Sequence, residues 1–169
     1  MGAAWSMNSQ GDVYRDQGLY PAAAASYRQC LQLFRELGDP WGIAATLGDL
    51  GSLATKERAY DTASSLYRES IAIFRQLDHK RGIARLMECF ACLSAAQHES
   101  ESSLRLAGTA AALRQSIGAP LTPAEESKLK AALEPAREAL TENAGATAWL
   151  EGWAMAPETA VERLLGAKP

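Results

Sequence analysis

The sequence predicts an all-α protein built from about three consecutive helical hairpins, followed by further helices at its C-terminal end. Three observations support this fold class. Hydrophobic residues make up 47% of the 169 residues, and much of that share is alanine, the residue with the highest helix propensity. Runs of valine, isoleucine and threonine, which favour strands, are missing. The chain also repeats itself every 40 residues, which is typical of repeat proteins.

The repeat is clearest in the first half of the chain, where residues 11–44 align without a gap on residues 51–84. The matching pairs include Gly11/Gly51, Tyr20/Tyr60, Ala23/Ala63, Tyr27/Tyr67, Leu31/Ile71, Phe34/Phe74 and Gly42/Gly82. A third copy follows at the same offset, but its tyrosines have become Ser100 and Ala107. Terminal repeats are usually atypical, because they face a cap and not another repeat.

Each period divides into two predicted helices. The first helices are expected at about 3–17, 41–56 and 80–97. The second helix of the first copy is expected at about 21–37, where Pro21 suits a first helical turn and apolar residues recur at spacings of three and four. In the second copy, Asp61 is predicted to cap the equivalent helix. The resulting hairpins, about 3–38, 41–78 and 80–118, form a predicted repeat domain over residues 1–118.

Residues 119–169 are predicted to form capping helices. Thr122 is placed to cap a helix over about 123–142, and Pro135 is expected to kink or split that helix. A last short helix is expected at about 157–165. An apolar cluster between these helices is interpreted as a seal on the end of the repeats, with stacking on a ligand as the alternative. It consists of Trp149, Leu150 and Trp153.

The residues at the hairpin crossings resemble the tetratricopeptide signature. The clearest instance is Leu47-x-x-Leu50-Gly51 followed by Tyr60-x-x-Ala63-x-x-x-Tyr67, and a second is Gly11 with Tyr20-x-x-Ala23-x-x-x-Tyr27. Glycine and alanine permit close approach of the helices, while the tyrosines fill the gap to the next helix. The resemblance implies a right-handed α-α superhelix whose first helices line a groove. The 40-residue period also fits HEAT or armadillo repeats, since tetratricopeptide units have about 34 residues, but the glycine and tyrosine spacing favours the tetratricopeptide type.

A second set of motifs lies in the C-terminal half, at residues 104–108, 113–114, 117–120, 148–152 and 157–161. With the repeats before them, they make residues 40–166 similar to the C-terminal region of large bacterial signalling regulators. Those proteins pair a STAND-type ATPase with a tetratricopeptide array, and some add a LuxR-like helix-turn-helix or a cyclase domain. The resemblance implies that this chain is a fragment of such a regulator.

Charge and composition argue against several classes of protein. The net charge is −3, without the basic stripe that nucleic-acid binding requires. No apolar stretch approaches the roughly 20 residues that span a bilayer, and the N-terminus lacks the features of a signal peptide. Three cysteines, an odd number, do not suggest a disulfide framework. We therefore expect a cytoplasmic protein that binds neither nucleic acid nor membrane.

Little in the sequence points to catalysis. Neither of two glycine-rich phosphate-binding motifs, G-x-x-x-x-G-K-S/T and G-x-G-x-x-G, occurs in the sequence. Cys89-x-x-Cys92 suggests redox or metal chemistry, but it falls in the middle of a predicted helix, away from the helix N-terminus that lowers a thiol pKa. A structural zinc site needs four ligands, and Cys30, His79 and His98 lack suitable spacing from the pair. We interpret the two cysteines as packing or groove-lining thiols, and predict no catalytic residue, no metal and no cofactor.

The tetratricopeptide resemblance places the partner-binding residues on the first helix of each hairpin. The predicted contact residues are Asp12, Arg15, Asp49, Lys56, Arg85 and Glu88. Some family members use a Lys/Asn/Arg clamp for a peptide carboxylate, but Asp12 and Asp49 stand where that clamp needs amides or cations. We therefore predict a protein-interaction module with a regulatory sensing role, which binds a polar peptide or a helix. The alternative is a structural or oligomerisation scaffold with an empty groove.

The first helix raises one further hypothesis. It has no preceding repeat to cover Trp5 and Met7, and an exposed apolar face of this kind usually marks an interface. Either an upstream repeat or a second copy of the chain would cover this face, so homodimerisation through this helix is a hypothesis.

Overall fold

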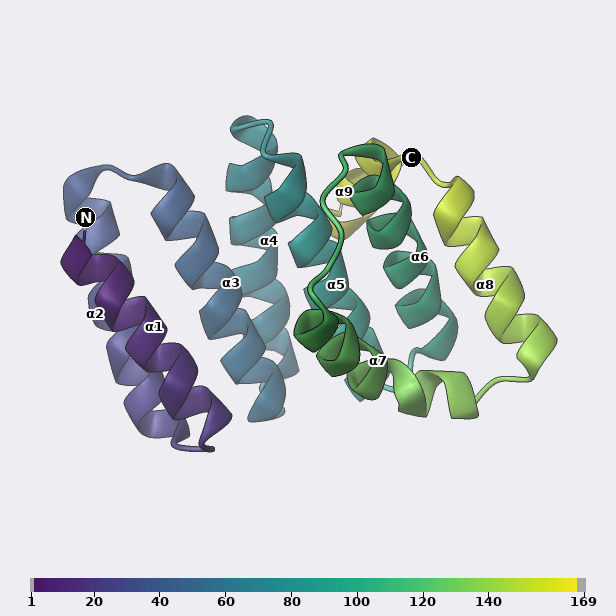
Figure 1. Cartoon of the computed structure of the whole chain (residues 1–169), viewed down its shortest axis with the longest axis horizontal. Helices are drawn as coiled ribbons and strands as arrows, with labels where there is room; N and C mark the ends of the chain where they lie inside the picture. The colour runs from purple at the N-terminus through teal and green to yellow at the C-terminus, as the bar shows by residue number, and fades with distance from the viewer. Residues whose placement is uncertain (1, 167–169) are drawn as a thin grey trace. The chain divides into compact units, whose positions relative to one another are not determined.

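The computed structural model describes residues 2–166, and the regular secondary structure in this range is entirely α-helical (Figure 1). The chain divides into two compact units, Met1–Leu77 (unit 1) and Asp78–Pro169 (unit 2). Unit 1 contains α1 (Gly2–Asp16), α2 (Tyr20–Leu37), α3 (Pro40–Lys56) and α4 (Tyr60–Gln76). Unit 2 contains α5 (Lys80–Ala96), α6 (Ser100–Ser116), α7 (Pro123–Glu138), α8 (Glu142–Ala154) and α9 (Pro157–Leu164).

The predicted helical hairpins are present. Helix α1 packs on α2, α3 on α4, and α5 on α6. The four helices whose bounds were predicted, α1, α2, α3 and α5, begin and end within one residue of those bounds. The all-α, tetratricopeptide-like fold class is therefore confirmed. The third hairpin belongs to the same compact unit as the C-terminal helices.

Glycine and tyrosine determine the helix crossing in each hairpin of unit 1. The side chain of Tyr27 in α2 is fully buried, and its ring occupies the space where a Cβ atom on Gly11 of α1 would stand. Tyr67 of α4 has the same relation to Gly51 of α3. The absence of a side chain on one helix thus makes room for an aromatic ring from the other, as the sequence motif predicts.

The turns repeat with the same period as the helices. The residue two positions after the first helix of each hairpin has a left-handed backbone, with φ of 75° at Gly18, 60° at Arg58 and 63° at His98. Glycine adopts this conformation without steric cost, whereas other residues do so with difficulty. The hairpin geometry therefore imposes the left-handed conformation on Arg58 and His98. The position of His98 is explained by this turn.

One predicted helix cap is wrong. Helix α4 begins at Tyr60, its N-cap residue is Ala59, and no side chain caps it. Asp61 lies inside the first turn, two positions after the N-cap residue Ala59, so its side chain is not placed to cap the helix. Its carboxylate still lies near the positive end of the helix dipole, which favours negative charge.

The start of α7 agrees with the prediction, but its end does not. Thr122 forms a capping box, in which the Glu125 N–H donates to Thr122 Oγ1 at 3.3 Å and the Thr122 N–H donates to Glu125 Oε2 at 2.8 Å. The pKa of Glu125 is lowered, first by the hydrogen bond from the Thr122 backbone N–H and then by the hydrogen bond from the Thr122 hydroxyl. Helix α7 contains Pro135 but ends at Glu138, short of the predicted end. Proline removes a backbone hydrogen bond, and Thr141 caps the separate helix α8.

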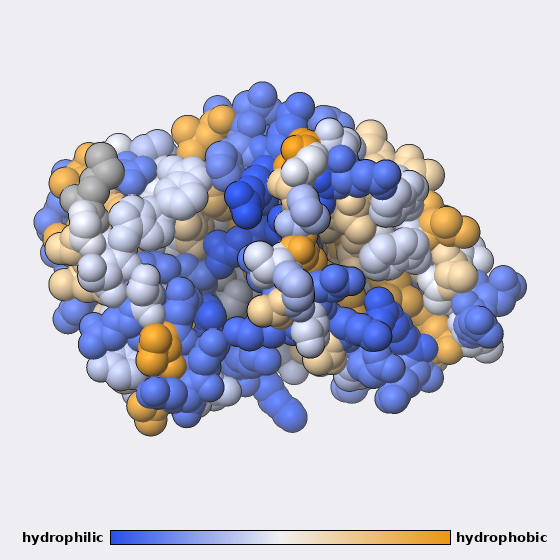
Figure 2. All heavy atoms as spheres, viewed as in Figure 1, coloured by the Kyte–Doolittle hydropathy of each residue, from blue (hydrophilic) through white to orange (hydrophobic). Residues whose placement is uncertain are grey.

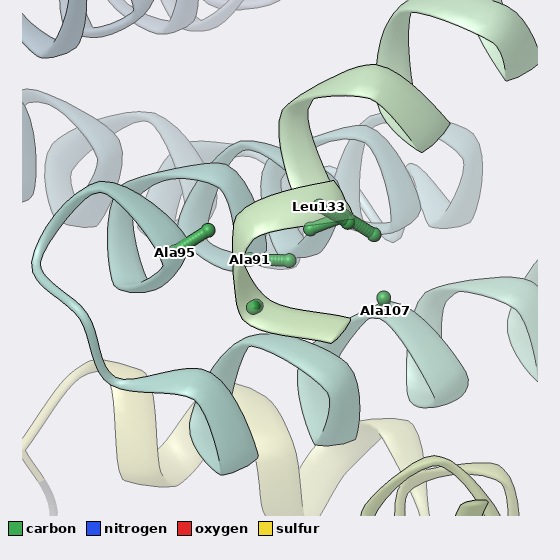
Figure 3. Packing of buried hydrophobic residues seen from close by; sticks show 5 residues of the cluster. Ala91, Ala95, Ala107 and Leu133 are labelled. Atoms are coloured by element: carbon green, nitrogen blue, oxygen red, sulfur yellow. The ribbon is translucent and has the colours of Figure 1, made fainter. Parts of the chain in front are cut away.

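Helix α7 packs on the third hairpin at the position where the first two hairpins carry tyrosine. The equivalent residue is Ala107 of α6, and the space is taken by Leu133 of α7, which is 1% exposed. Figure 3 shows the Leu133 side chain between Ala91 of α5 and Ala107 of α6. Burying a leucine side chain stabilises a fold by about 1.5–3 kcal/mol. Helix α7 therefore fills part of the space that the third repeat leaves where the first two repeats have a tyrosine.

Helix α8 packs closely along α6. Gly108 of α6 and Gly152 of α8 lie against the backbone of the opposite helix, and neither position has room for a Cβ atom. The Thr109 hydroxyl donates to the Gly152 carbonyl oxygen at 2.8 Å, and the Arg105 guanidinium contacts the Glu151 carboxylate at 2.7 Å. Small residues and polar bonds together fix this pair of helices.

Candidate functional site

A polar network joins α1 and α3 in unit 1. The buried Asn8 side chain donates to Asp49 Oδ2 at 3.0 Å. Arg15 Nη1 lies 3.0 Å from Asp12 Oδ1 and 3.9 Å from Asp49 Oδ1. Since Asp49 is only 4% exposed, these bonds compensate for removing its carboxylate from water.

The hydroxyl of Tyr27 completes the network from α2. It donates to Asp12 Oδ1 at 2.8 Å and accepts a hydrogen bond from Arg15 Nη1 at 3.0 Å. Burial, and then the bond to Asp12, raise the pKa of Tyr27 well above its ordinary value, so the phenol stays protonated. Burial lowers the pKa of Arg15, but the surrounding Tyr27, Asp12, Asp49 and Asp16 raise it overall, so the guanidinium stays charged.

The second hairpin makes the same arrangement with neutral groups. Tyr67 Oη lies 3.1 Å from Thr55 Oγ1 and donates to Ser52 Oγ at 3.4 Å. Ser52 and Thr55 stand 40 positions after Asp12 and Arg15. The tyrosine hydroxyl is therefore a common structural feature of both hairpins, whereas its charged partners are particular to the first.

This difference predicts unequal effects of removing the two hydroxyls. Tyr27→Phe is expected to destabilise unit 1 by about 2 kcal/mol, because hydrogen bonds to charged groups contribute about 1.5–3 kcal/mol. Tyr67→Phe is expected to cost about 1 kcal/mol, as for neutral hydrogen bonds. Native-state hydrogen exchange of the α2 and α4 amides in the full chain measures both. Equal losses for the two variants would contradict the charge-assisted network.

An aromatic cluster lies at the other end of the same helices. The ring of Trp5 in α1 is 4.7 Å from the ring of Phe34 in α2 and 4.8 Å from the ring of Trp41 in α3. Trp41 is 41% exposed and Trp5 is half-buried. Aromatic side chains that keep this much surface are available to pack against another molecule.

The aromatic and charged ends lie along one side of α1 and α3. In α3, residues 41, 45, 49, 52 and 56 recur at spacings of three and four, which places them on one side of the helix. We call this surface the α1–α3 face, and define it by Trp5, Asp12, Arg15, Trp41, Ser52 and Lys56. Ten residues separate Trp5 from Arg15 along α1, so the two ends are about 15 Å apart at 1.5 Å per helical residue.

The structure brings three of the predicted contact residues together and gives them different exposures. Asp12 and Arg15 are half-buried on the α1–α3 face, and Asp49 lies beneath them as a positioning residue for Arg15 and Asn8. Lys56 is exposed at the C-terminal end of α3. The sequence reasoning missed Trp41, although its spacing of four residues before Ala45 on α3 was a usable signal.

The other two predicted contact residues lie in α5 of unit 2. Arg85 is half-buried, and Glu88 is 9% exposed. Glu88 accepts hydrogen bonds from the Nε and Nη2 groups of Arg114 in α6, the latter at 2.9 Å. The hydrogen bond with Glu88 raises the pKa of Arg114. Arg114 was not predicted as a site residue. It stands where the first two repeats carry phenylalanine, and this replacement of an apolar residue by a charged one was a usable signal in the sequence.

The three cysteines are not joined by disulfide bonds. Cys30 is buried, and its thiol donates to the Ala4 carbonyl oxygen at 3.1 Å. Burial raises the pKa of Cys30, which suppresses the reactive thiolate. Cys89 and Cys92 are half-buried. Within residues 2–166, no group of three or more His, Cys, Asp or Glu side chains is placed to hold a metal ion.

No helix in the described part of the chain combines the length and the apolar character needed to cross a bilayer.

Comparison with known proteins gives one similarity. Residues 2–76 match the family model described as tetratricopeptide repeat. No curated protein and no solved structure matches the chain. The matched residues cover α1 to α4, in which glycine, alanine and tyrosine make the hairpin crossings described above. The two hairpins of unit 1 are therefore similar to tetratricopeptide repeats, in sequence and in the packing that the sequence produces.

Proposed function

We propose that this protein is an interaction module that binds a peptide segment of a partner protein on the α1–α3 face. Tetratricopeptide repeats generally mediate protein–protein interaction, and unit 1 carries the match to that family. The observation that supports the choice of this surface is that its two ends differ, one being aromatic and the other charged. Trp5 and Trp41 provide an aromatic contact at one end. At the other end Arg15 lies among carboxylates and Lys56 is exposed.

The aromatic end is expected to supply most of the binding energy. Tryptophan, tyrosine and arginine dominate the residues whose truncation weakens protein interfaces. Trp41 contacts the ring of Trp5, so its orientation is set before a partner arrives. Such preorganisation reduces the entropic cost of association. A bound peptide would place an apolar or aromatic side chain against this pair.

The charged end is expected to select among peptides. Arg15 lies near three carboxylates, those of Asp12, Asp16 and Asp49, and Lys56 is exposed beyond them. An extended peptide of about five residues covers the 15 Å between the two ends at about 3.3 Å per residue. Charges at such a rim affect specificity and association rate more than affinity.

The wider context is also part of the proposal. The resemblance of residues 40–166 to the C-terminal region of bacterial signalling regulators supports a sensing role inside a larger regulator. The odd number of cysteines supports a reducing, cytoplasmic location. Homodimerisation through α1 is retained as a proposal, supported by Val13, which is 53% exposed on that helix. No step of the proposed function requires catalysis.

Peptide selection on the full chain tests this function. A random peptide library displayed on phage is selected against the protein, and the affinities of synthetic versions are measured by calorimetry. Trp41→Ala is expected to weaken binding about tenfold, which corresponds to about 1.4 kcal/mol. Lys56→Glu is expected to weaken the binding of acidic peptides and to strengthen that of basic ones.

Arg68→Glu provides the matched control, because Arg68 is an exposed cation on α4 and not on the α1–α3 face. The control variant should bind the selected peptides unchanged. Selected peptides that tolerate Trp41→Ala, or a library that yields no binder, would contradict the proposal and favour the structural scaffold.

A further inference from the structure

A pocket of about 810 Å³ lies between α6, α7 and α8 in unit 2. Helices α7 and α8 both pack on α6 but hardly contact each other, and the pocket occupies the angle between them. Figure 2 shows pale and orange side chains in the hollow between the segment leading into α7 and helix α8. Pockets that bind small molecules have volumes of about 300–1,000 Å³.

The departures of the third repeat from the first two converge on this pocket. Where the earlier repeats have Tyr27/Tyr67, Leu31/Ile71, Phe34/Phe74 and Asn8/Gly48, the third has Ala107, Ala111, Arg114 and Glu88. All four of these third-repeat residues line the pocket. Two large side chains have been replaced by alanine, and Leu133 refills only part of the space. The pocket is therefore a specific consequence of how this hairpin differs from its neighbours.

The walls of the pocket are apolar and aromatic. Trp149 and Trp153 line it from α8, and Leu129 lines it from α7. Trp149 and Leu129 are half-buried, whereas Trp153 keeps 41% of its surface exposed. Indole rings prefer offset or edge-to-face contact with other aromatic groups, which adds about 0.5–1.5 kcal/mol to the burial of area. These walls favour a flat aromatic body.

A nearly buried guanidinium supplies a polar anchor. Arg114 is 8% exposed and lines the pocket. Of its five N–H groups, the structure assigns two to Glu88 and one to the Ala119 carbonyl oxygen at 3.2 Å. The remaining two have no acceptor among the described residues, so they are available to a bound oxygen atom.

The charges that line the pocket favour an anion. Three lining residues are cations and two are carboxylates, which leaves a net charge of +1. The cations are Arg114, Lys130 and Arg137, and the carboxylates are Glu88 and Glu126. Lys130 has no ion-pair partner within residues 2–166, and Arg137 reaches Glu134 only at 4.0 Å. A carboxylate entering the pocket meets more positive than negative charge.

We infer that this pocket binds a small aromatic carboxylate, with its ring between the two indoles and its carboxylate toward Arg114 and Lys130. The inference does not depend on the peptide-binding role of the α1–α3 face, because the pocket lies entirely in unit 2. It gives the C-terminal helices a ligand-binding role in addition to covering the third hairpin.

Calorimetric titration of the full chain with 2-naphthoate tests the inference. Saturable binding with one site is expected, and the neutral 2-naphthamide should bind at least about tenfold more weakly. Ala111→Leu restores the side-chain size of the first repeat and should weaken naphthoate binding about tenfold by filling the pocket. Lys130→Gln should weaken naphthoate about threefold and leave naphthamide unchanged.

Trp41→Ala and Lys56→Gln in unit 1 serve as controls and should leave naphthoate binding unchanged. Circular dichroism checks that Ala111→Leu retains its helices, and Trp153→Ala, at an exposed position, is a second variant that should weaken binding without affecting folding. Absence of saturation at millimolar naphthoate, equal affinity for the amide, or insensitivity to both pocket variants would overturn the inference. A concentration-dependent dimer that Ala111→Leu dissociates, without naphthoate binding, would overturn it too.

Discussion

Replacing Arg114 by methionine is expected to destabilise unit 2 by about 3–5 kcal/mol, the usual cost of leaving a buried charge without its partner. Glu88 is 9% exposed, and its partner in the ion pair is Arg114, which is 8% exposed. The single variant leaves the Glu88 carboxylate in an apolar setting next to the pocket. Native-state hydrogen exchange of the α5 and α6 amides in the full chain measures the loss.

The double variant Glu88→Met/Arg114→Met is the informative control. Replacing both members of a buried ion pair by apolar residues of similar volume is often neutral or stabilising. We therefore expect the double variant to recover most of the stability that Arg114→Met loses. If it is as unstable as the single variant, the arginine contributes through its packing and not through the charge of Glu88.

Replacing Gly152 by alanine is expected to destabilise the α6–α8 pair by about 3 kcal/mol. A Cβ atom at this position would overlap the backbone of Arg105, including its carbonyl oxygen. Backbone atoms cannot move aside as the end of a flexible side chain can, so the helices must separate. Overpacking typically costs about 1–3 kcal/mol and occasionally more. Separation also lengthens the 2.8 Å hydrogen bond from Thr109 to the Gly152 carbonyl oxygen.

Gly145 offers a matched control in the same helix. A Cβ atom there would meet only the end of the Leu104 side chain, at an ordinary 3.4 Å. Alanine is favoured over glycine in a helix by about 1 kcal/mol, so Gly145→Ala should be neutral or stabilising. Thermal unfolding followed by circular dichroism should therefore show a lower midpoint for Gly152→Ala and an unchanged or higher midpoint for Gly145→Ala. A similar shift for both would mean that helix propensity, and not the α6–α8 crossing, decides the outcome.

The local features of this protein could be predicted because they depend on short-range physical chemistry. The 40-residue period and the apolar spacings within it predicted the bounds of α1, α2, α3 and α5 to within one residue. Thr122 was recognised as a cap because side-chain capping requires a particular residue type at one position. Asp61 shows the limit of this reasoning, since the helix starts two residues earlier than predicted and Asp61 becomes a first-turn residue.

The candidate site was less predictable, because exposure depends on what packs on each helix. The tetratricopeptide resemblance put Asp12, Arg15 and Asp49 on the first helices of the hairpins, and the structure brings these three side chains near one another. The resemblance did not reveal that Asp49 is buried beneath Arg15, or that Glu88 pairs with an arginine 26 positions away. Both facts depend on contacts between helices, and the sequence period carries no information about which polar side chains meet across them.

The amino-acid order alone determined the helical hairpins and the glycine and tyrosine crossings, because these follow from propensity, periodicity and side-chain size within one repeat. Only the tertiary structure decided the place of α7 and α8. Both pack on α6, and the small side chains of the third repeat leave a pocket between them. The physical reason is that a missing side chain is visible in the sequence, whereas the space it leaves becomes a binding site only if no later segment fills it.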